Sequence, residues 1–187
     1  MLEYQKAINK IAIIFLIGIM FLVTSCNNRK ERIEMQVHNL YSNTINLPYS
    51  DMDTLVIDSV NLIKGTKYQL LVYLDSTECT PCYASHHEEW EYILNECRKY
   101  EPSIALSIII DSKNVSDNIK RKFVESTVKK SIYIDANGAF RKINPVFPES
   151  NIMHVILLDK DNKVVLVGNP LNNKKIEELL YQKLRES

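Results

Sequence analysis

The sequence predicts a single α/β domain with a mixed sheet flanked by helices, and two patterns support this prediction. The first is a series of short apolar runs without polar alternation, which is typical of strands buried on both faces. The second is the order of the elements: strand, helix, strand, helix and strand, followed by a hairpin and a closing helix. With 187 residues, the chain can form one medium domain and an additional segment.

Six strands and three helices are expected, in the following order. Apolar runs predict strands at residues 55–57, 68–74, 103–110, 131–135, 153–158 and 163–167. Periodic apolar positions predict helices at residues 81–100, 115–123 and 176–184. Between the last two strands, Asp159-Lys160-Asp161-Asn162 is typical of a hairpin turn.

Two of these helices have a defined apolar face. In the helix at 81–100, the face consists of Trp90, Ile93, Leu94 and Cys97, so Trp90 and Cys97 are expected to be buried core residues. In the closing helix, the stripe consists of Ile176, Leu179, Leu180 and Leu184. Asn172 and Asn173 precede this helix and are expected to cap it.

The composition excludes several classes of protein. The 23 basic residues balance the 23 acidic residues, so the chain has no electrostatic footprint for nucleic acid. The four glycines do not form a phosphate-binding GxGxxG or GxxxxGK[ST] motif. Four cysteines are too few for a disulfide scaffold, so each cysteine has to be interpreted by its surroundings.

The N-terminus resembles a bacterial lipoprotein signal. Thirteen uncharged, mainly apolar residues at 11–23 follow Lys6 and Lys10, whereas a membrane span needs about 20 residues. Thr24, Ser25 and Cys26 come next, and two small residues before a cysteine match the lipidation motif. The resemblance implies lipidation of Cys26; the alternative is a plain secretory signal in which this cysteine stands by chance.

The lipoprotein interpretation divides the chain into three parts. Residues 1–25 are the signal peptide, residues 26–46 a lipidated polar tether, and residues 47–187 the folded domain. Because several acyl chains give a durable anchor, we expect a domain held at a membrane of the cell envelope. The residue after the cysteine is Asn27. An aspartate there would resemble an inner-membrane retention signal, so asparagine favours the periplasmic face of the outer membrane.

The most specific motif is Cys79-Thr80-Pro81-Cys82, which follows the strand at 68–74 and starts the next helix. Pro81 suits a first helical turn, where its missing N–H is not needed. The N–H groups and the positive dipole end of a helix stabilise a thiolate, which is the attacking species in disulfide exchange. A spacing of two residues lets the second sulfur reach the first. A strand–CxxC–helix unit therefore predicts a redox site.

From about residue 47 to 184, the sequence resembles the thioredoxin fold, and in particular the lipid-anchored envelope thioredoxins and redoxins of the TlpA-like type. The segments LVYLDSTECTPC and IMHVILLDKDNKVV carry this resemblance, together with the closing helix. It implies thiol–disulfide exchange without a cofactor, with Cys79 as nucleophile and Cys82 as resolving cysteine. The implied partners are protein thiols and disulfides of the envelope and a redox donor.

Three positions near the pair differ from the family pattern. Glu78 stands where the family usually has tryptophan, and its charge opposes thiolate formation. Tyr73 stands where thioredoxins bury a carboxylate, and Met153 where they have a cis-proline. Because a cis bond before a non-proline residue costs about 2.5–4 kcal/mol, we expect a trans peptide at Met153 and a different docking edge.

Two other interpretations of the motif remain open at this point. The first is a Cu(I)-binding, metallochaperone-like module, in which Cys79 and Cys82 are joined by His86, Met153 or His154. The helical spacing puts His86 on a similar face to the cysteines, although each histidine taken alone is more typical of a partly exposed residue than of a ligand. The second is a redox-inactive domain used only as an interaction surface.

Overall fold

The computed structural model describes residues 29–57, 67–75, 83, 86–101 and 104–186. The chain divides into two compact units, Met1–His38 and Asn39–Ser187. In the first unit, residues 29–38 are helical. Within the described ranges, no helix has the length and apolar character needed to cross a membrane.

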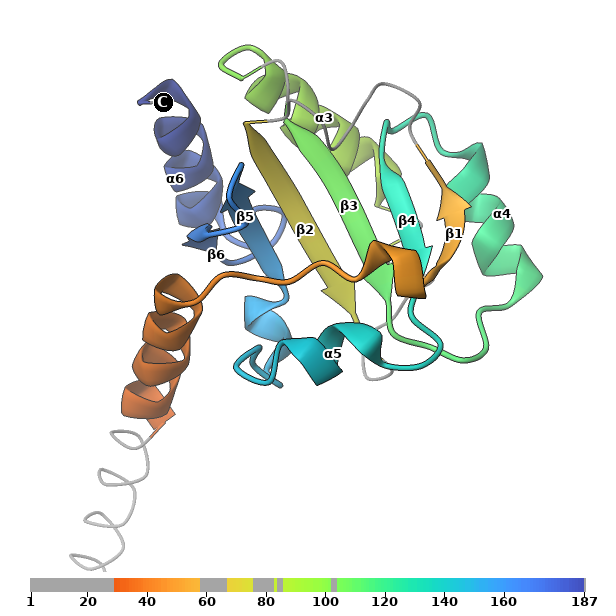
Figure 1. The fold of residues 1–187 in the computed structure, drawn as a ribbon. Coiled ribbons are helices and arrows are strands. Elements are labelled where there is room, and N and C mark those ends of the chain that lie inside the picture. The colour runs from red at the N-terminus through yellow and green to blue at the C-terminus, as the bar shows by residue number, and fades with distance from the viewer. Residues whose placement is uncertain (1–28, 58–66, 76–82, 84–85, 102–103, 187) are drawn as a thin grey trace, which may run out of the picture. The chain divides into compact units, whose positions relative to one another are not determined.

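The second unit is built on a six-stranded mixed sheet with the order β1-β4-β3-β2-β5-β6 (Figure 1). Its strands are β1 (Asp53–Val56), β2 (Tyr68–Leu74), β3 (Ala105–Ile110), β4 (Ser131–Ile134), β5 (Val155–Asp159) and β6 (Val164–Val167). β2, β3 and β4 run parallel, whereas β1 is antiparallel to β4 and the β5–β6 hairpin extends the sheet antiparallel to β2. The mixed sheet predicted from the sequence, and implied by the thioredoxin-like resemblance, is confirmed.

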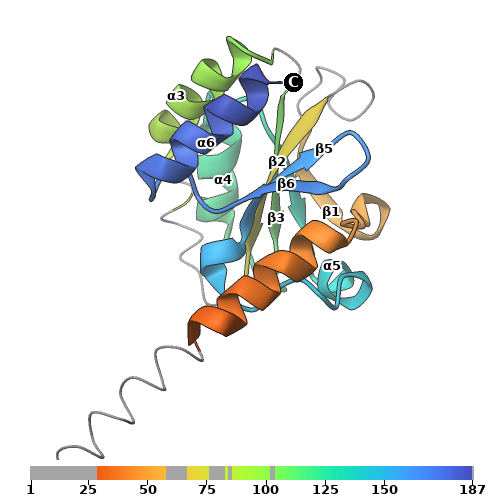
Figure 2. The same ribbon diagram turned by 90° about the vertical axis from the view of Figure 1, so that its left-hand side faces the viewer.

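Helices cover both faces of this sheet. They are α3 (His87–Arg98), α4 (Asp117–Glu125), α5 (Ala139–Ile143) and α6 (Lys174–Arg185), with short 3-10 turns η1 (Tyr49–Asp51) and η2 (Asn151–Met153). Figures 1 and 2 show α3, α4 and α6 on one face and α5 on the other.

The central strand β2 is buried along its whole length, as its almost entirely apolar sequence predicts. Leu70, Val72 and Leu74 belong to the core under α3, α4 and α6. Because side chains alternate along a strand, Leu71 and Tyr73 are directed to the opposite face, where Tyr73 stacks on Phe140 of α5. The predicted apolar face of α3, including Trp90 and Cys97, is buried in the same core as Leu70, Val72 and Leu74.

Three details differ from the sequence predictions. α3 begins at His87, so His86 is its N-cap residue and not a residue of the helix itself. β5 begins at Val155, because Met153 belongs to the 3-10 turn η2 that precedes it. Leu179, predicted to lie in the apolar stripe of α6, is 39% exposed, while Leu180 and Leu184 are buried.

The predicted turn and helix cap are confirmed. Asn162 donates its N–H to the carbonyl of Asp159 at 3.0 Å and adopts a φ of 58°, a left-handed conformation that asparagine tolerates. Asn173 caps α6 by accepting the N–H groups of Lys175 and Ile176. Asparagine residues therefore fix both the turn between β5 and β6 and the start of α6.

The second unit includes residues that the sequence assigns to the tether. Leu40 and Ile45 are both fully buried. The N–H of Ile45 donates to the carbonyl of Asn162 at 2.9 Å. Asn46 exchanges two 2.8 Å hydrogen bonds with the side chain of Asn144. The compact unit starts at Asn39, eight residues before residue 47, because these side chains complete its core.

Cys97 lies fully buried in α3, as predicted for a core residue. Burial, which disfavours the charged thiolate, is the main reason why the pKa of this thiol rises to about 12. The thiol therefore stays protonated in the folded chain at pH values where an unfolded chain would ionise it.

This difference predicts an alkaline loss of stability. Between pH 9 and 11, the free energy of unfolding should fall by roughly 2 to 3 kcal/mol more in the wild type than in Cys97→Ala, because only the unfolded thiol ionises there. Urea unfolding of both proteins across this range measures the difference and cancels the contribution of the tyrosines. A difference that stays constant with pH would contradict the expectation.

Candidate functional site

The predicted redox motif, residues 78–82, lies outside the residues that the structure describes, and so does the predicted lipidation site, Cys26. The chain is described again on both sides of the motif in sequence. β2 ends at Leu74, and α3 begins at His87. The motif thus comes, in sequence, between the central strand and the helix that packs on it, and the site can be built from the residues at this edge.

Three aspartates follow directly on the three parallel strands. Asp75 follows β2, Asp111 follows β3 and Asp135 follows β4. The N–H of Asp111 donates to Leu74 and that of Asp135 to Ile110, both at 2.8 Å, so the strand ends lie next to one another. Ligands of open α/β sheets bind at this carboxyl edge of the parallel strands.

A buried phenol lies at the centre of this edge. Tyr73 has no exposed surface, and its hydroxyl donates to the carboxylate of Asp111. The same oxygen accepts a 3.0 Å hydrogen bond from Nε of Arg141 in α5. Burial, followed by the bond to Asp111, raises the pKa of Tyr73 above its usual range. Tyr73 is therefore a neutral phenol that links β2, β3 and α5.

The guanidinium of Arg141 continues this network to the segment after α5. Its Nη1 donates to the carbonyls of Phe147 and Pro148 at 3.3 and 3.1 Å. Its Nη2 lies 3.6 Å from a carboxylate oxygen of Asp75, the residue that follows β2. The planar group also covers the ring of Tyr73, 4.9 Å from its centroid. One side chain thus connects the end of β2 with the loop at residues 144–150.

His154 is the next member of the network and is only 1% exposed. Its Nε2 lies 3.3 Å from Nη2 of Arg141 and 3.1 Å from the carbonyl of Pro148. Its ring meets Tyr73 edge-on and stacks on Phe147. The sequence predicts a partly exposed histidine at this position; this prediction is wrong, because the aromatic cluster on the α5 face encloses the ring.

Asp135 positions the helix that supplies Arg141. The Asp135 carboxylate is fully buried and accepts the N–H groups of Ala139 and Phe140, each at 2.8 Å. Gly138 precedes α5 with a φ of 65°, a left-handed conformation that glycine adopts without strain. These two features start a five-residue helix that is too short for a periodic sequence signal.

On the other side of the motif, Tyr83 is fixed one residue after Cys82. Its ring stacks on Trp90 at a centroid distance of 6.1 Å, and its hydroxyl accepts a 3.0 Å hydrogen bond from Asn169. Asn169 lies in the loop that follows β6. The chain is therefore anchored to α3 and to this loop where it leaves the motif.

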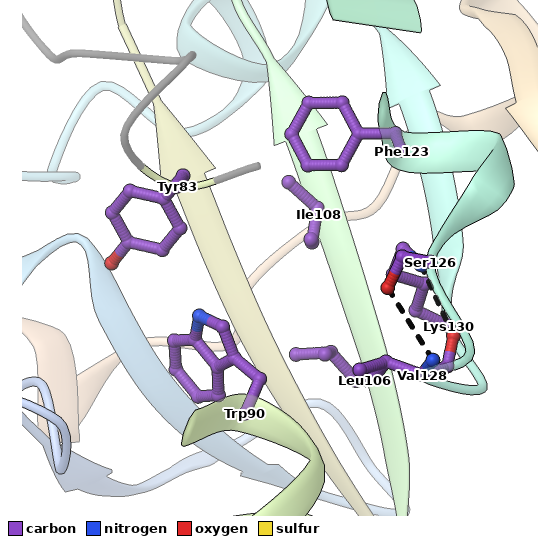
Figure 3. A pocket seen from close by; sticks show the side chains of 8 residues that line it. All are labelled: Tyr83, Trp90, Leu106, Ile108, Phe123, Ser126, Val128 and Lys130. Atoms are coloured by element: carbon purple, nitrogen blue, oxygen red, sulfur yellow. Dashed lines mark hydrogen bonds between the residues drawn. The ribbon is translucent and has the colours of Figure 1, made fainter. Parts of the chain in front are cut away.

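Tyr83 and Trp90 also line a pocket over β3 (Figure 3). The remaining walls are Leu106, Ile108, Phe123 and the segment leading to Lys130. Within the described residues, the buried Nε1 of Trp90 has no acceptor. The enclosed space is about 10 Å³, room for one water molecule and not for an organic ligand. The pocket is a packing feature between α3, β3 and α4.

Met153, for which the sequence predicts a trans peptide, is buried in η2. Among the described residues there is no cis peptide bond, so the expected trans peptide at this position is confirmed. The N–H of Tyr73 donates to the carbonyl of His154 at 2.9 Å, which holds this turn against the end of β2.

The histidines of the metal-binding interpretation each have other contacts. His86 is exposed, and its Nδ1 lies 3.1 Å from a carboxylate oxygen of Glu89. In His154, the Nε2 faces the cationic guanidinium of Arg141, which disfavours a bound cation. Within the described ranges, no group of three or more potential metal-ligating side chains occurs. Cys79 and Cys82 lie outside those ranges.

Sequence reasoning missed Asp111, Arg141 and the aromatic residues Phe140 and Phe147. One signal was available, since an aspartate directly after each of three consecutive parallel strands marks a polar sheet edge. Arg141 carried no such signal, because its partner Tyr73 is 68 residues away in the sequence.

No protein-family model matches the chain, and no curated protein matches it. Several solved structures resemble it. An uncharacterized thioredoxin-like protein from Porphyromonas gingivalis is 18% identical, with a TM-score of 0.48 over 77% of this chain and 93% of that one. A putative thiol:disulfide interchange protein DsbE from Chlorobium tepidum is 15% identical, with a TM-score of 0.47 over 76% and 98%.

A third similar structure is copper-bound ScoI from Bradyrhizobium japonicum, which is 15% identical with a TM-score of 0.46 over 72% of this chain and 94% of that one. The fold class of the present chain follows from its own strand order and strand directions.

Proposed function

We propose that this chain is a thiol–disulfide oxidoreductase in which Cys79 is the nucleophile and Cys82 the resolving cysteine. The observation that carries the proposal is the place of the Cys-x-x-Cys motif in the chain. In sequence it comes between the carboxyl end of the central strand β2, which is parallel to β3, and the start of α3. Sites at the carboxyl edge of parallel strands are open to partners while the sheet below them is rigid.

The proposed reaction transfers two electrons to a protein disulfide. The Cys79 thiolate attacks one sulfur of the substrate disulfide, a mixed disulfide forms, and the other substrate sulfur leaves as a thiolate. The Cys82 thiolate then attacks the Cys79 sulfur, which releases the second substrate thiol and leaves the Cys79–Cys82 disulfide. A dithiol donor of the envelope has to reduce this disulfide before the next turnover.

Two described residues close to the motif in sequence, Tyr73 before it and Tyr83 after it, are each held by several contacts, and this supports the proposed role. Tyr73 and Arg141 tie the end of β2 to β3 and α5, while Tyr83 ties the exit of the motif to α3. Disulfide exchange requires three sulfur atoms in close alignment, so a rigid frame lowers the cost of reaching that geometry.

We further propose that the protein acts from a membrane anchor. The support is the N-terminal pattern, a thirteen-residue run after two lysines and then Thr24-Ser25-Cys26. In this proposal Cys26 carries the acyl chains, and the domain faces the periplasm from the outer membrane.

Cysteine variants of the full-length chain in neutral detergent test the proposed activity. The wild type should catalyse the reduction of insulin disulfides by dithiothreitol, and Cys79→Ser should fall to the uncatalysed rate. In cells, Cys82→Ser should accumulate mixed disulfides on non-reducing gels, whereas Cys79→Ser should not. Cys97→Ser is the matched control and should keep the activity, because Cys97 is buried in the core.

Two outcomes would overturn the proposal. A wild type without reductase activity and a Cys82→Ser variant without mixed disulfides would leave only an interaction domain. Stoichiometric Cu(I) binding that the Cys79→Ser/Cys82→Ser variant loses, in a protein without reductase activity, would assign metal delivery instead.

A further inference from the structure

The connection between β4 and α5 contains an asparagine that is followed directly by a glycine, Asn137-Gly138. Ala136 and Asn137 form a turn, and the side chain of Asn137 is exposed. Within the described part of the chain, this side chain has no hydrogen-bond partner. No contact with a described residue therefore holds its amide in one orientation.

The backbone nitrogen of Gly138 is open to a reaction with this amide. An added Cβ at Gly138 would meet no atom within 4 Å, so the space beside its backbone is empty. Its N–H donates to none of the described residues, whereas the next two N–H groups, of Ala139 and Phe140, are held by Asp135 at 2.8 Å. The nitrogen that follows Asn137 is therefore neither shielded by a side chain nor engaged in a hydrogen bond with the described chain.

The covalent connection of these two groups allows them to close a five-membered ring. After hydroxide has removed its proton, the Gly138 nitrogen attacks the side-chain carbonyl carbon of Asn137, and ammonia leaves. Water then opens the resulting succinimide at one of its two carbonyls. One opening gives aspartate, and the other gives isoaspartate, in which the main chain runs through the former side chain. The chain thus exchanges ammonia for water, and no oxidant or cofactor takes part.

We propose that Asn137 is a site of spontaneous deamidation, at which the folded protein acquires an aspartate or an isoaspartate residue. Asn114 is a second exposed loop asparagine, but the β-branched Val115 follows it. A branched side chain is stiff and crowds the backbone nitrogen beside it, which hinders ring closure. The reaction at Asn137 is independent of the proposed redox function.

The isoaspartate product alters the segment that positions Arg141. It adds one carbon atom to the main chain between Asp135 and α5. The carboxylate of Asp135 is fully buried and holds the first two N–H groups of α5, so the longer connection displaces this helix or breaks these bonds. Arg141 in α5 bonds the hydroxyl of Tyr73 in β2. Isoaspartate should therefore destabilise the fold, whereas aspartate, which keeps the main-chain length, should not.

Incubation of the full-length chain in neutral detergent at mildly alkaline pH, followed by peptide mapping with mass spectrometry, tests the site. Loss of the amide at Asn137 should be at least about tenfold faster than at Asn114, because Val115 raises the barrier there. The rate should increase with pH, and part of the product should be methylated by protein isoaspartate methyltransferase. Asn137→Gln would need a six-membered ring and should lose the fast reaction. Equal rates at Asn137 and Asn114 would overturn the proposal.

Urea unfolding tests the structural consequence. The aged protein, enriched in isoaspartate by chromatography, should unfold at a lower urea concentration than Asn137→Asp, which carries the same charge. Asn137→Asp should keep the midpoint of the wild type, since this side chain is exposed. If the isoaspartate form and Asn137→Asp unfold at the same urea concentration, the inferred displacement of α5 is wrong.

Discussion

Replacing Arg141 by alanine should lower the free energy of unfolding by about 4 kcal/mol. Its guanidinium bonds Tyr73, two backbone carbonyls and His154, and it lies 3.6 Å from Asp75. In the alanine variant, the hydroxyl of Tyr73 and the carbonyl of Phe147 would each lose the hydrogen bond that Arg141 donates. The carboxylate of Asp75 would lose its nearby guanidinium. Breaking a buried charge network from one side costs about 3–5 kcal/mol. Urea denaturation followed by circular dichroism measures the loss.

Two matched variants distinguish the loss of the Arg141 contacts from a general effect of substitution in α5. Lys142→Ala removes an exposed cation from the same short helix and should change stability by no more than about 0.5 kcal/mol. Arg141→Lys keeps the charge but loses the planar fork, so it should recover less than half of the lost stability. Equal stabilities of Arg141→Ala and Lys142→Ala would show that the observed contacts contribute nothing.

The sheet could be predicted from the sequence because the strands carry their own signal. β2 is apolar at nearly every position, and a short apolar run between polar segments is typical of a strand buried on both faces. The apolar face of α3 was visible for a similar reason, since Trp90, Ile93, Leu94 and Cys97 repeat at helical spacing. Local patterns were therefore enough to predict the strands and the buried face of α3.

The polar network could not be predicted, because its members are joined across the fold. Arg141 and Tyr73 are 68 residues apart, and Arg141 stands in no motif. The helix that carries Arg141 has five residues, fewer than two turns, so it produces no periodic pattern. His154 was expected to be partly exposed, since nothing local indicates that Phe147 will stack on it.

The compact unit starts at Asn39, before the predicted domain boundary at residue 47, for a similar reason. Residues 26–46 are polar overall, and their composition indicates a tether. Leu40 and Ile45 are isolated apolar residues in this stretch, and two such residues do not form a pattern. Their role is visible only in the folded structure, where the segment bonds the β5–β6 hairpin and the residue after α5: Ile45 donates to Asn162, and Asn46 to Asn144.

A chain that begins at Leu47 should therefore be less stable than one that begins at Asn39, by about 4 kcal/mol. The shorter chain lacks Leu40 and Ile45, and burial of each contributes roughly 1.5–3 kcal/mol. It also leaves the buried amide of Asn144 without the backbone of Asn46, at roughly 1 kcal/mol per hydrogen bond. Ordering the additional backbone offsets part of this gain. Thermal and urea unfolding of the two chains, both without the anchor, measure the difference.

The substitution Leu40→Ala/Ile45→Ala in the longer chain identifies the cause. It should reproduce most of the loss, because it removes the buried side chains and keeps the backbone bonds. Asn39→Ala, at the first residue of the unit, is the matched control and should leave stability nearly unchanged, since this side chain is exposed. If the chain beginning at Leu47 is as stable as the longer one, residues 39–46 contact the domain without contributing to its free energy of unfolding.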